Sequence, residues 1–217
     1  MAPRKYTLGK RLESVEETRR RIVDATFELH NEKGVVATSM QDVAERADVA
    51  LRTVYNHYPT TDDLVAGCGA KVMVLLAPPT PAIFNGLSTL EERLMKLVRE
   101  LFAMYERGSL PLETARREQD KVAALVPFMA NVRAMRQGLV GEALRPFDVP
   151  RRVVKGTVAL TDYYVWKAFD DQDITTHQAV EVVYRSLVAL ANPDAVGGEG
   201  TGEMTRTIIL HREEGKL

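Results

Sequence analysis

Residues 38–64, TSMQDVAERADVALRTVYNHYPTTDDL, decide the fold of this chain. Thr38 is a favourable N-cap residue, and Val43 and Ala47 lie on one face of the helix that would follow it. At Asp48 the chain needs a residue that tolerates a left-handed backbone, and aspartate does so better than most residues. The stretch therefore predicts a short helix that ends in a tight turn.

A second short helix is predicted from Ala50 onward. Its periodicity buries Val54 against the first helix. The major groove of B-DNA is wide enough to admit a helix of this kind. The stretch as a whole predicts a helix-turn-helix, and the second helix exposes Leu51, Arg52, Tyr55 and Asn56.

The exposed side chains of the second helix suit contacts with DNA. Arg52 can form two parallel hydrogen bonds with a guanine, and Leu51 can lie against a thymine methyl group. Tyr55 and His57 are expected to contact the DNA backbone or pyrimidine edges, which sets register more than sequence. For Tyr58 we expect packing in the core instead.

The same residues carry a family resemblance. The pattern D-V-A-x-x-A-x-V-x-x-x-T-V-Y-x-H-Y-x-x-x-x-D-L, at residues 42–64, resembles the N-terminal signature of the tetracycline-repressor (TetR) family of bacterial transcription regulators. The resemblance is close from Glu16 to Leu64, and the remainder agrees only in its helical pattern and length. It implies that Gln41 and Thr53 face bases or phosphates.

Three positions depart from the family pattern. Asp48 stands where glycine is common in the turn. Ala50 stands where a hydroxyl group usually caps the second helix, which loses about 1 kcal/mol of capping unless Asp48 substitutes. Thr61 stands where many members carry a lysine that contacts phosphate. The complete set of predicted DNA-contacting residues is Arg19, Arg20, Gln41, Leu51, Arg52, Thr53, Tyr55, Asn56, His57 and Thr61.

Composition places few limits on function. The chain has 217 residues, of which 45% are hydrophobic and 27% charged, and its net charge is −1. Such a chain can form one or two soluble domains with a sizeable core. Because the net charge is near zero, any DNA-binding basic surface must be local. Cys68 is the only cysteine, which excludes an internal disulfide and a cysteine-only zinc site.

We expect a cytoplasmic protein, because no signal peptide and no apolar run of membrane-spanning length is evident. We expect no enzyme activity, cofactor or metal site. The sequence has no HExxH motif, phosphate loop or nucleophile elbow. Its four histidines are scattered: His30, His57, His177 and His211.

The N-terminus is locally basic. It can be an arm that follows phosphates or enters the minor groove, or a solvated terminus; both interpretations stay open for residues 4–11. For residues 19–21, close to the predicted helix-turn-helix, phosphate contact is favoured. The basic residues are Arg4, Lys5, Lys10, Arg11, Arg19, Arg20 and Arg21.

The chain predicts an all-α fold. Capping boxes at 14–17 and 88–91 place helix starts near Val15 and Ser88, and Thr60 caps a fourth helix. Glycines at 67 and 69 interrupt that helix; we favour close packing there over a compliant joint. Further helices are expected at 111–124, 127–146, 150–169 and 176–191.

Three regions follow from this pattern. We expect an N-terminal arm and helix-turn-helix domain at 1–60, a helical effector-binding and dimerisation domain at 61–192, and a flexible tail at 193–217. The family resemblance implies a dimer interface at 150–169 and 176–191, and a ligand cavity. Each candidate ligand-binding residue, taken singly, is better explained as core; the candidates are Phe102, Tyr105, Met129, Met135, Tyr163, Tyr164 and Trp166.

The resemblance implies a homodimeric repressor of a palindromic operator in double-stranded DNA, released by a small and mostly apolar effector. One alternative is a constitutive or architectural DNA-binding protein without an effector, which a fully packed interior would support. A more distant alternative is an all-helical enzyme.

Overall fold

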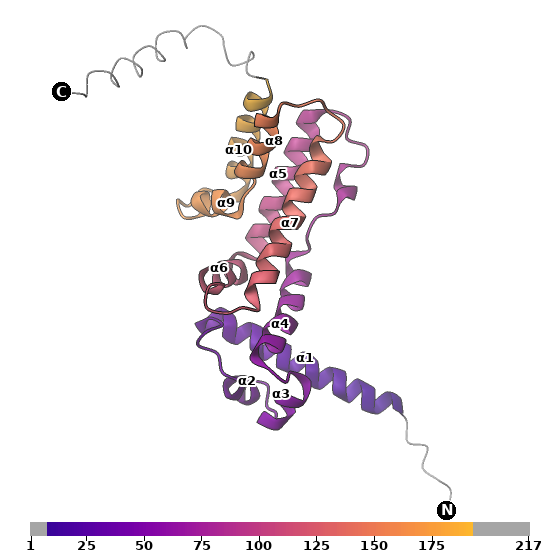
Figure 1. Ribbon diagram of the computed structural model, residues 1–217, viewed down its shortest axis with the longest axis vertical. Coiled ribbons are helices and arrows are strands. Elements are labelled where there is room, and N and C mark those ends of the chain that lie inside the picture. Colours follow the sequence, from indigo (N-terminus) through magenta and orange to yellow (C-terminus); the bar gives the residue numbers. More distant parts are fainter. Residues whose placement is uncertain (1–7, 193–217) are drawn as a thin grey trace, which may run out of the picture. The chain divides into compact units, whose positions relative to one another are not determined.

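The computed structural model describes residues 8–192, and throughout that range the chain is helical and contains no strand (Figure 1). The predicted tail at 193–217 and the basic arm at 4–11 lie outside the residues whose side chains are described. The elements are α1 (Leu8–Lys33), α2 (Met40–Arg46), α3 (Leu51–His57), α4 (Thr61–Leu76), the 3-10 helix η1 (Pro81–Phe84), α5 (Leu90–Arg107), α6 (Ser109–Glu118), α7 (Leu125–Leu144), α8 (Arg151–Leu160), α9 (Tyr163–Asp170) and α10 (Thr176–Ala191).

The described chain divides into two compact units. Unit 1 contains residues 8–80 and 103–138, and unit 2 contains residues 81–102 and 139–192. Helices α5 and α7 contribute residues to both units. The expected boundary between residues 60 and 61 falls inside unit 1, and the assignment of 61–192 to effector binding and dimerisation stays a prediction.

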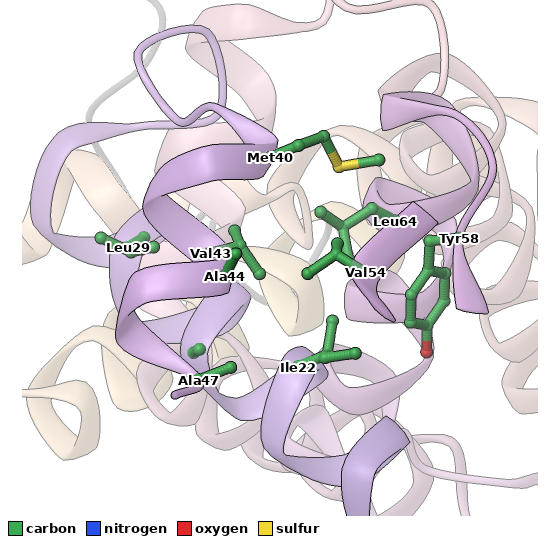
Figure 2. Packing of buried hydrophobic residues seen from close by; sticks show 10 residues of the cluster. Ile22, Leu29, Met40, Val43, Ala44, Ala47, Val54, Tyr58 and Leu64 are labelled. Carbon is green, nitrogen blue, oxygen red and sulfur yellow. The ribbon is translucent and has the colours of Figure 1, made fainter. Parts of the chain in front are cut away.

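The helix-turn-helix of unit 1 is built around one apolar cluster. Helices α2 and α4 pack on α1, and α3 packs on α2 (Figure 1). Figure 2 shows Val54 of α3 between Val43 and Ala44 of α2 on one side and Tyr58 on the other. Val54 and Ile22 of α1 are completely buried. Burying a side chain of this size stabilises the fold by about 1.5–3 kcal/mol.

The turn between α2 and α3 has the predicted form. Asp48 adopts a positive φ of 51°. No side chain caps α3, since its N-cap residue is Ala50 and Asp48 does not substitute for the missing hydroxyl. The sequence therefore identified both the turn and the capping defect correctly.

Two predicted caps are displaced by one residue. Ser39, not Thr38, caps α2, and its hydroxyl accepts a hydrogen bond from the amide of Asp42. Thr38 instead donates to the carbonyl of Gly34 at 2.7 Å. In unit 2, Thr89 accepts from the amide of Glu92 at 3.2 Å, so the cap of α5 is one residue later than expected. The predicted cap of α4 at Thr60 is confirmed.

Helix α1 begins at Leu8, so the predicted start near Val15 is wrong. The carbonyl of Ser14 accepts a hydrogen bond from Thr18 at 2.9 Å, as it would inside a helix. Residues 10–13 are good helix formers, which lets the helix extend past the serine. A capping-box pattern in the sequence does not stop a helix when favourable residues precede it.

Helix α4 continues without interruption through Gly67 and Gly69, contrary to the prediction of a break. A Cβ at Gly67 would lie 2.6 Å from Cε1 of Tyr58, so the tyrosine ring rests directly on the helix backbone. The preference for close packing is thus confirmed at Gly67. The helix ends at Ala77 in the left-handed conformation, and Arg107 donates to the carbonyl of Leu76 at 2.8 Å.

Helix α6 is tied to the loop after α1 by a buried carboxylate. Glu118, the last residue of α6, accepts a hydrogen bond from the amide of Val36 at 2.8 Å. Burial by itself raises the pKa of Glu118, but hydrogen bonds from the amides of Val36 and Val35 and from Arg117 hold it below its ordinary value. We call this contact the Glu118 clamp.

Unit 2 is organised on α5, α8, α9 and α10. The predicted helix 150–169 is two helices, because Asp162 caps a new helix by accepting from the amide of Tyr164. Buried Arg93 of α5 donates to the carbonyl of Ala143 at 2.9 Å, near the end of α7. A Cβ on Gly156 of α8 would collide with Leu190 of α10, so these two helices approach closely.

One segment passes a length-and-composition test for a membrane span, which corrects the expectation that none would. It covers residues 61–84, with a mean hydropathy of 1.3. Core helices of soluble proteins can have the same length and composition. Here the helical part ends at Leu76, and one face of α4 packs on α1.

Candidate nucleic-acid interface

Helix α3 has two different faces. Val54 and Tyr58 are 0% and 3% exposed and fix the helix against α1, α2 and α4. On the opposite face Leu51 and Tyr55 are 36% and 47% exposed. The outward side of α3 is therefore free to meet a partner. Arg52 and Asn56 are also exposed, and Thr53 and His57 are half-buried.

Arg52 is the exposed cation of α3. Among the described residues it has no hydrogen-bond or salt-bridge partner. A guanidinium presents five N–H donors in a planar fork. Because none of these donors is occupied within the described chain, Arg52 can use them on a base edge.

Arg19 and Arg20 make weak contacts, and only the contact of Arg19 reaches Tyr58 at the end of α3. Arg19 donates to the hydroxyl of Tyr58 at 3.2 Å, and its guanidinium lies 5.7 Å from the centre of that ring. Arg20 pairs with Glu17 at 2.6 Å, and both side chains are more than half exposed. Exposed pairs of this kind are easily exchanged for a phosphate.

Arg21 contacts the turn of the helix-turn-helix, and the phosphate contact expected for residues 19–21 stays a prediction. It donates to the carbonyl of Ala47 at 2.5 Å and to the carbonyl of Asp48 at 2.8 Å. These carbonyls belong to the turn between α2 and α3. Arg21 thus positions the turn before α3. No sequence pattern indicates this contact, because the partners are backbone atoms 26 and 27 residues away.

The remaining candidates lie at the edges of the motif. Gln41 is exposed and donates to Glu45 at 2.8 Å. Thr61 is exposed in the first turn of α4. Other cations of this region are occupied: Lys33 pairs with Asp42 at 2.8 Å. DNA contact by any of the ten candidates stays a prediction.

The candidate ligand-binding residues do not form one group. Tyr105, Met129 and Met135 belong to unit 1; Phe102, Tyr163, Tyr164 and Trp166 belong to unit 2. Most are buried, but Tyr164 is 58% exposed.

Unit 1 contains a cavity of about 260 Å³, and none of these seven residues lines it. Its walls come from α1, α4, α6 and the start of α7. The sequence signal that could have found this cavity is the run of small residues on α4, which includes Ala66, Gly69 and Ala70.

These features define the class of protein: an all-helical protein with an N-terminal helix-turn-helix whose second helix presents a free arginine. Residues 22–68 match the model of bacterial regulatory proteins of the tetR family. The match covers the N-terminal domain, so residues 22–68 are similar to the helix-turn-helix domain of this family. This similarity points to a regulator of transcription.

Comparison with individual proteins agrees with this assignment. The chain is 35% identical over 106 residues to the HTH-type transcriptional repressor KstR of Mycolicibacterium smegmatis, covering 48% of this chain and 52% of that protein. It is 30% identical over 137 residues to the repressor KstR of Mycobacterium tuberculosis, covering 58% of this chain and 62% of that protein. The chain therefore spans about half to three fifths of the length of these relatives.

Solved structures share the fold. A tetR-family transcriptional regulator from Streptomyces coelicolor superimposes with a TM-score of 0.64 at 16% identity, covering 90% of this chain and 89% of that one. The multidrug binding protein EbrR, complexed with imidazole, gives a TM-score of 0.57 at 24% identity, covering 85% and 96%. At these identities the likeness concerns the fold alone.

Proposed function

We propose that this chain is a sequence-specific DNA-binding regulator of transcription that inserts α3 into the major groove. The observation that carries the proposal is the division of α3 into a buried face held by Val54 and an exposed face with Arg52, which has no partner among residues 8–192. A helix fixed on one side and free on the other can dock as a rigid body. As a regulator it acts in the cytoplasm, where it reaches DNA directly.

We infer that the regulator works as a homodimer on a palindromic operator. Two copies of α3 then enter successive major grooves about 34 Å apart. The predicted interface helices carry exposed apolar side chains that a second copy can cover. They are Val154 on α8, Tyr164 on α9 and Val182 on α10.

We infer further that the protein is a repressor released by a small molecule. The relatives from both mycobacterial species are described as transcriptional repressors, which supports this sign of regulation. A constitutive regulator would be favoured by a fully packed interior, whereas unit 1 holds a cavity of about 260 Å³. Release requires only that the effector bind the DNA-free state more tightly than the DNA-bound state. The difference in binding free energy is about 1–3 kcal/mol in typical cases.

Selection of bound DNA from a random pool tests the proposal. We expect a palindromic consensus with two half-sites. Arg52→Ala should relax preference at one symmetric pair of positions, at a cost of about 1–3 kcal/mol. Arg46→Ala is the matched control, because Arg46 of α2 pairs with Glu28 and Glu32 and should leave the consensus unchanged. Absence of any enriched sequence would reject sequence-specific binding.

A further inference from the structure

The Glu118 clamp joins two parts of unit 1 that pack separately. The apolar cluster of the helix-turn-helix consists of residues between 22 and 64, and no residue of α6 is among its described members. Helices α1, α2 and α3 and the start of α4 therefore share a core of their own, and we call this part of unit 1 the head. Contacts between the head and α6 can then fix the orientation of the head without being needed for its core.

The head meets α6 through the loop between α1 and α2. Val35 of this loop is buried in a second, small apolar cluster that includes Ala115 of α6 and Leu125 of α7. The side chain of Val36, the next residue, is exposed. Apolar packing therefore ends at Val35, and the backbone that follows depends on polar contacts.

Glu118 supplies these polar contacts. Its carboxylate accepts a hydrogen bond from the amide of Val36 at 2.8 Å and another from the amide of Val35. A Cβ at Gly34 would collide with Oε1 of Glu118, so the carboxylate lies directly against the loop backbone. Three consecutive residues of the loop are thus in contact with one side chain of α6.

The carboxylate of Glu118 is buried but fully compensated. Removing a charged group from water is unfavourable unless hydrogen bonds replace its hydration. Burial raises the pKa of Glu118, yet the hydrogen bonds from Val36, Arg117 and Val35 keep it below its ordinary value, so the group is charged near pH 7. Water could serve an exposed amide equally well. What the carboxylate adds is therefore a fixed position for the loop.

The loop connects Glu118 to the start of α2. The hydroxyl of Thr38 donates to the carbonyl of Gly34 at 2.7 Å, and the amide of Thr38 donates to the carbonyl of Val35 at 3.1 Å. Thr38 directly precedes Ser39, which is the N-cap of α2. Helix α2 in turn packs on α3. A displacement of the carboxylate would therefore displace α2, and α3 with it.

We propose that Glu118 is a positioning residue for operator binding, because its carboxylate fixes the head against α6 and so sets the orientation in which α3 meets DNA. The proposal rests on the proposed function as a dimeric DNA-binding regulator. Without the carboxylate the head keeps its own core but occupies several orientations. Apparent affinity falls with the fraction of competent heads, and both heads of the dimer must be competent at once. If each head is competent about one third of the time, affinity falls about ninefold.

The test compares substitutions of Glu118 in the full chain, by titration of the operator that the wild type selects. Glu118→Ala removes the acceptor and should weaken operator binding about tenfold. Glu118→Gln keeps a side-chain oxygen at the same reach and should bind within about threefold of the wild type. Arg117→Ala is the matched control on α6. It removes only the ion pair between Glu118 and a mostly exposed arginine, and it should bind like the wild type.

Half-site spacing separates a positioning role from a loss of stability. One base pair added or removed between the half-sites changes their separation by about 3.4 Å. The wild type should lose at least tenfold in affinity for the altered operators, whereas Glu118→Ala should lose less than threefold. Leu112→Ala removes a buried side chain of α6 but no hydrogen bond to the loop. It should lower the melting temperature and keep the wild-type spacing preference.

Glu118→Asp replaces Glu118→Ala if that variant does not fold. It keeps the charge, but the shorter side chain no longer reaches the amide of Val36, so the same weakening and the same tolerance of spacing are expected. Three results would overturn the proposal. They are unchanged affinity and spacing preference in the variant that removes the contact, equal weakening by Glu118→Gln, and an equal loss of spacing preference in Leu112→Ala.

Selection of DNA by the wild type is judged separately. If the wild type selects no sequence, the proposed function fails, and the positioning role fails with it. If the wild type selects an operator that Glu118→Ala binds with the same affinity and spacing preference, the proposed function stands and the positioning role is rejected.

Discussion

The helix-turn-helix of unit 1 and the helices α8, α9 and α10 of unit 2 place their apolar side chains differently. In the helix-turn-helix, Val54 and Tyr58 point inward, and α3 exposes mainly groups that can form hydrogen bonds. In unit 2, Tyr164 and Val182 are exposed although their helices are well packed on the other side. The first region buries its apolar side chains within one chain, whereas the second leaves some of them exposed, where the proposed dimer would cover them.

The largest expected effect comes from breaking the inward face of α3. Val54→Asp places a carboxylate where the side chain is fully buried and should lower the free energy of unfolding by about 4 kcal/mol. Chemical denaturation of the free protein measures the change. Tyr55→Asp, on the exposed face, should leave stability within about 0.5 kcal/mol yet abolish operator binding. Equal destabilisation by both would contradict the two-faced description of α3.

A second prediction concerns pH and the interior of unit 1. Burial lowers the pKa of His30 from 6.5 to about 4, with nearby Glu118 acting in the opposite direction. Above pH 6.5 the imidazole is neutral in folded and unfolded chains. Between pH 6.5 and 4 only the unfolded chain binds the proton, so stability should fall as pH falls, by up to about 3 kcal/mol.

The measurement is the free energy of unfolding as a function of pH in wild type and His30→Gln. The variant should show a smaller loss between pH 6.5 and 4. His177→Gln is the control, because His177 is exposed at the start of α10. Identical pH profiles for wild type and His30→Gln would show that the imidazole is not held neutral.

The outward face of unit 2 gives the third prediction. Val182→Glu places charges in the predicted interface and should weaken dimerisation by roughly 10- to 100-fold, or about 1.4–3 kcal/mol. Sedimentation equilibrium measures the dimer dissociation constant. Val74→Glu makes the same substitution on α4, where Val74 is 81% exposed, and should leave the constant unchanged. An unchanged dimer dissociation constant for Val182→Glu would show that Val182 does not lie in the interface.

The smallest expected effect concerns the missing N-cap of α3. Ala50 has the extended backbone of an N-cap, with φ −66° and ψ 143°, but no side-chain cap. Ala50→Ser should therefore raise the free energy of unfolding by about 1 kcal/mol. Thermal unfolding of ligand-free protein detects such a gain. Ala37→Ser, in the loop before α2, is the control, and an equal gain there would remove capping as the cause.

Local chemistry made the helix-turn-helix predictable. The turn at Asp48, the missing cap at Ala50 and the cap at Thr60 depend on residues within a few positions of one another. The start of α1 was missed because good helix formers precede the capping pattern at Ser14. The break at Asp162 was missed because Asp162 caps a new helix inside a stretch that is otherwise favourable for one continuous helix.

The cavity and the Glu118 clamp could not be predicted in this way. Glu118 bonds to an amide 82 residues earlier in the chain, and that distance is set by the fold. The cavity depends on where α1, α4, α6 and α7 leave space, so its lining combines residues with no common sequence pattern. Single aromatic or methionine residues on predicted helices gave no guide to it.

The contact between Tyr58 and Gly67 has a mechanical consequence. No side chain separates the ring of Tyr58 from the backbone of α4 at Gly67. A displacement of α4 therefore cannot be taken up by a change of side-chain rotamer between them. A tilt of α4 must carry Tyr58, and with it the end of α3, in the same direction. The two helices therefore move together, and a small rotation of α4 changes the orientation of α3 and of Arg52 on its exposed face.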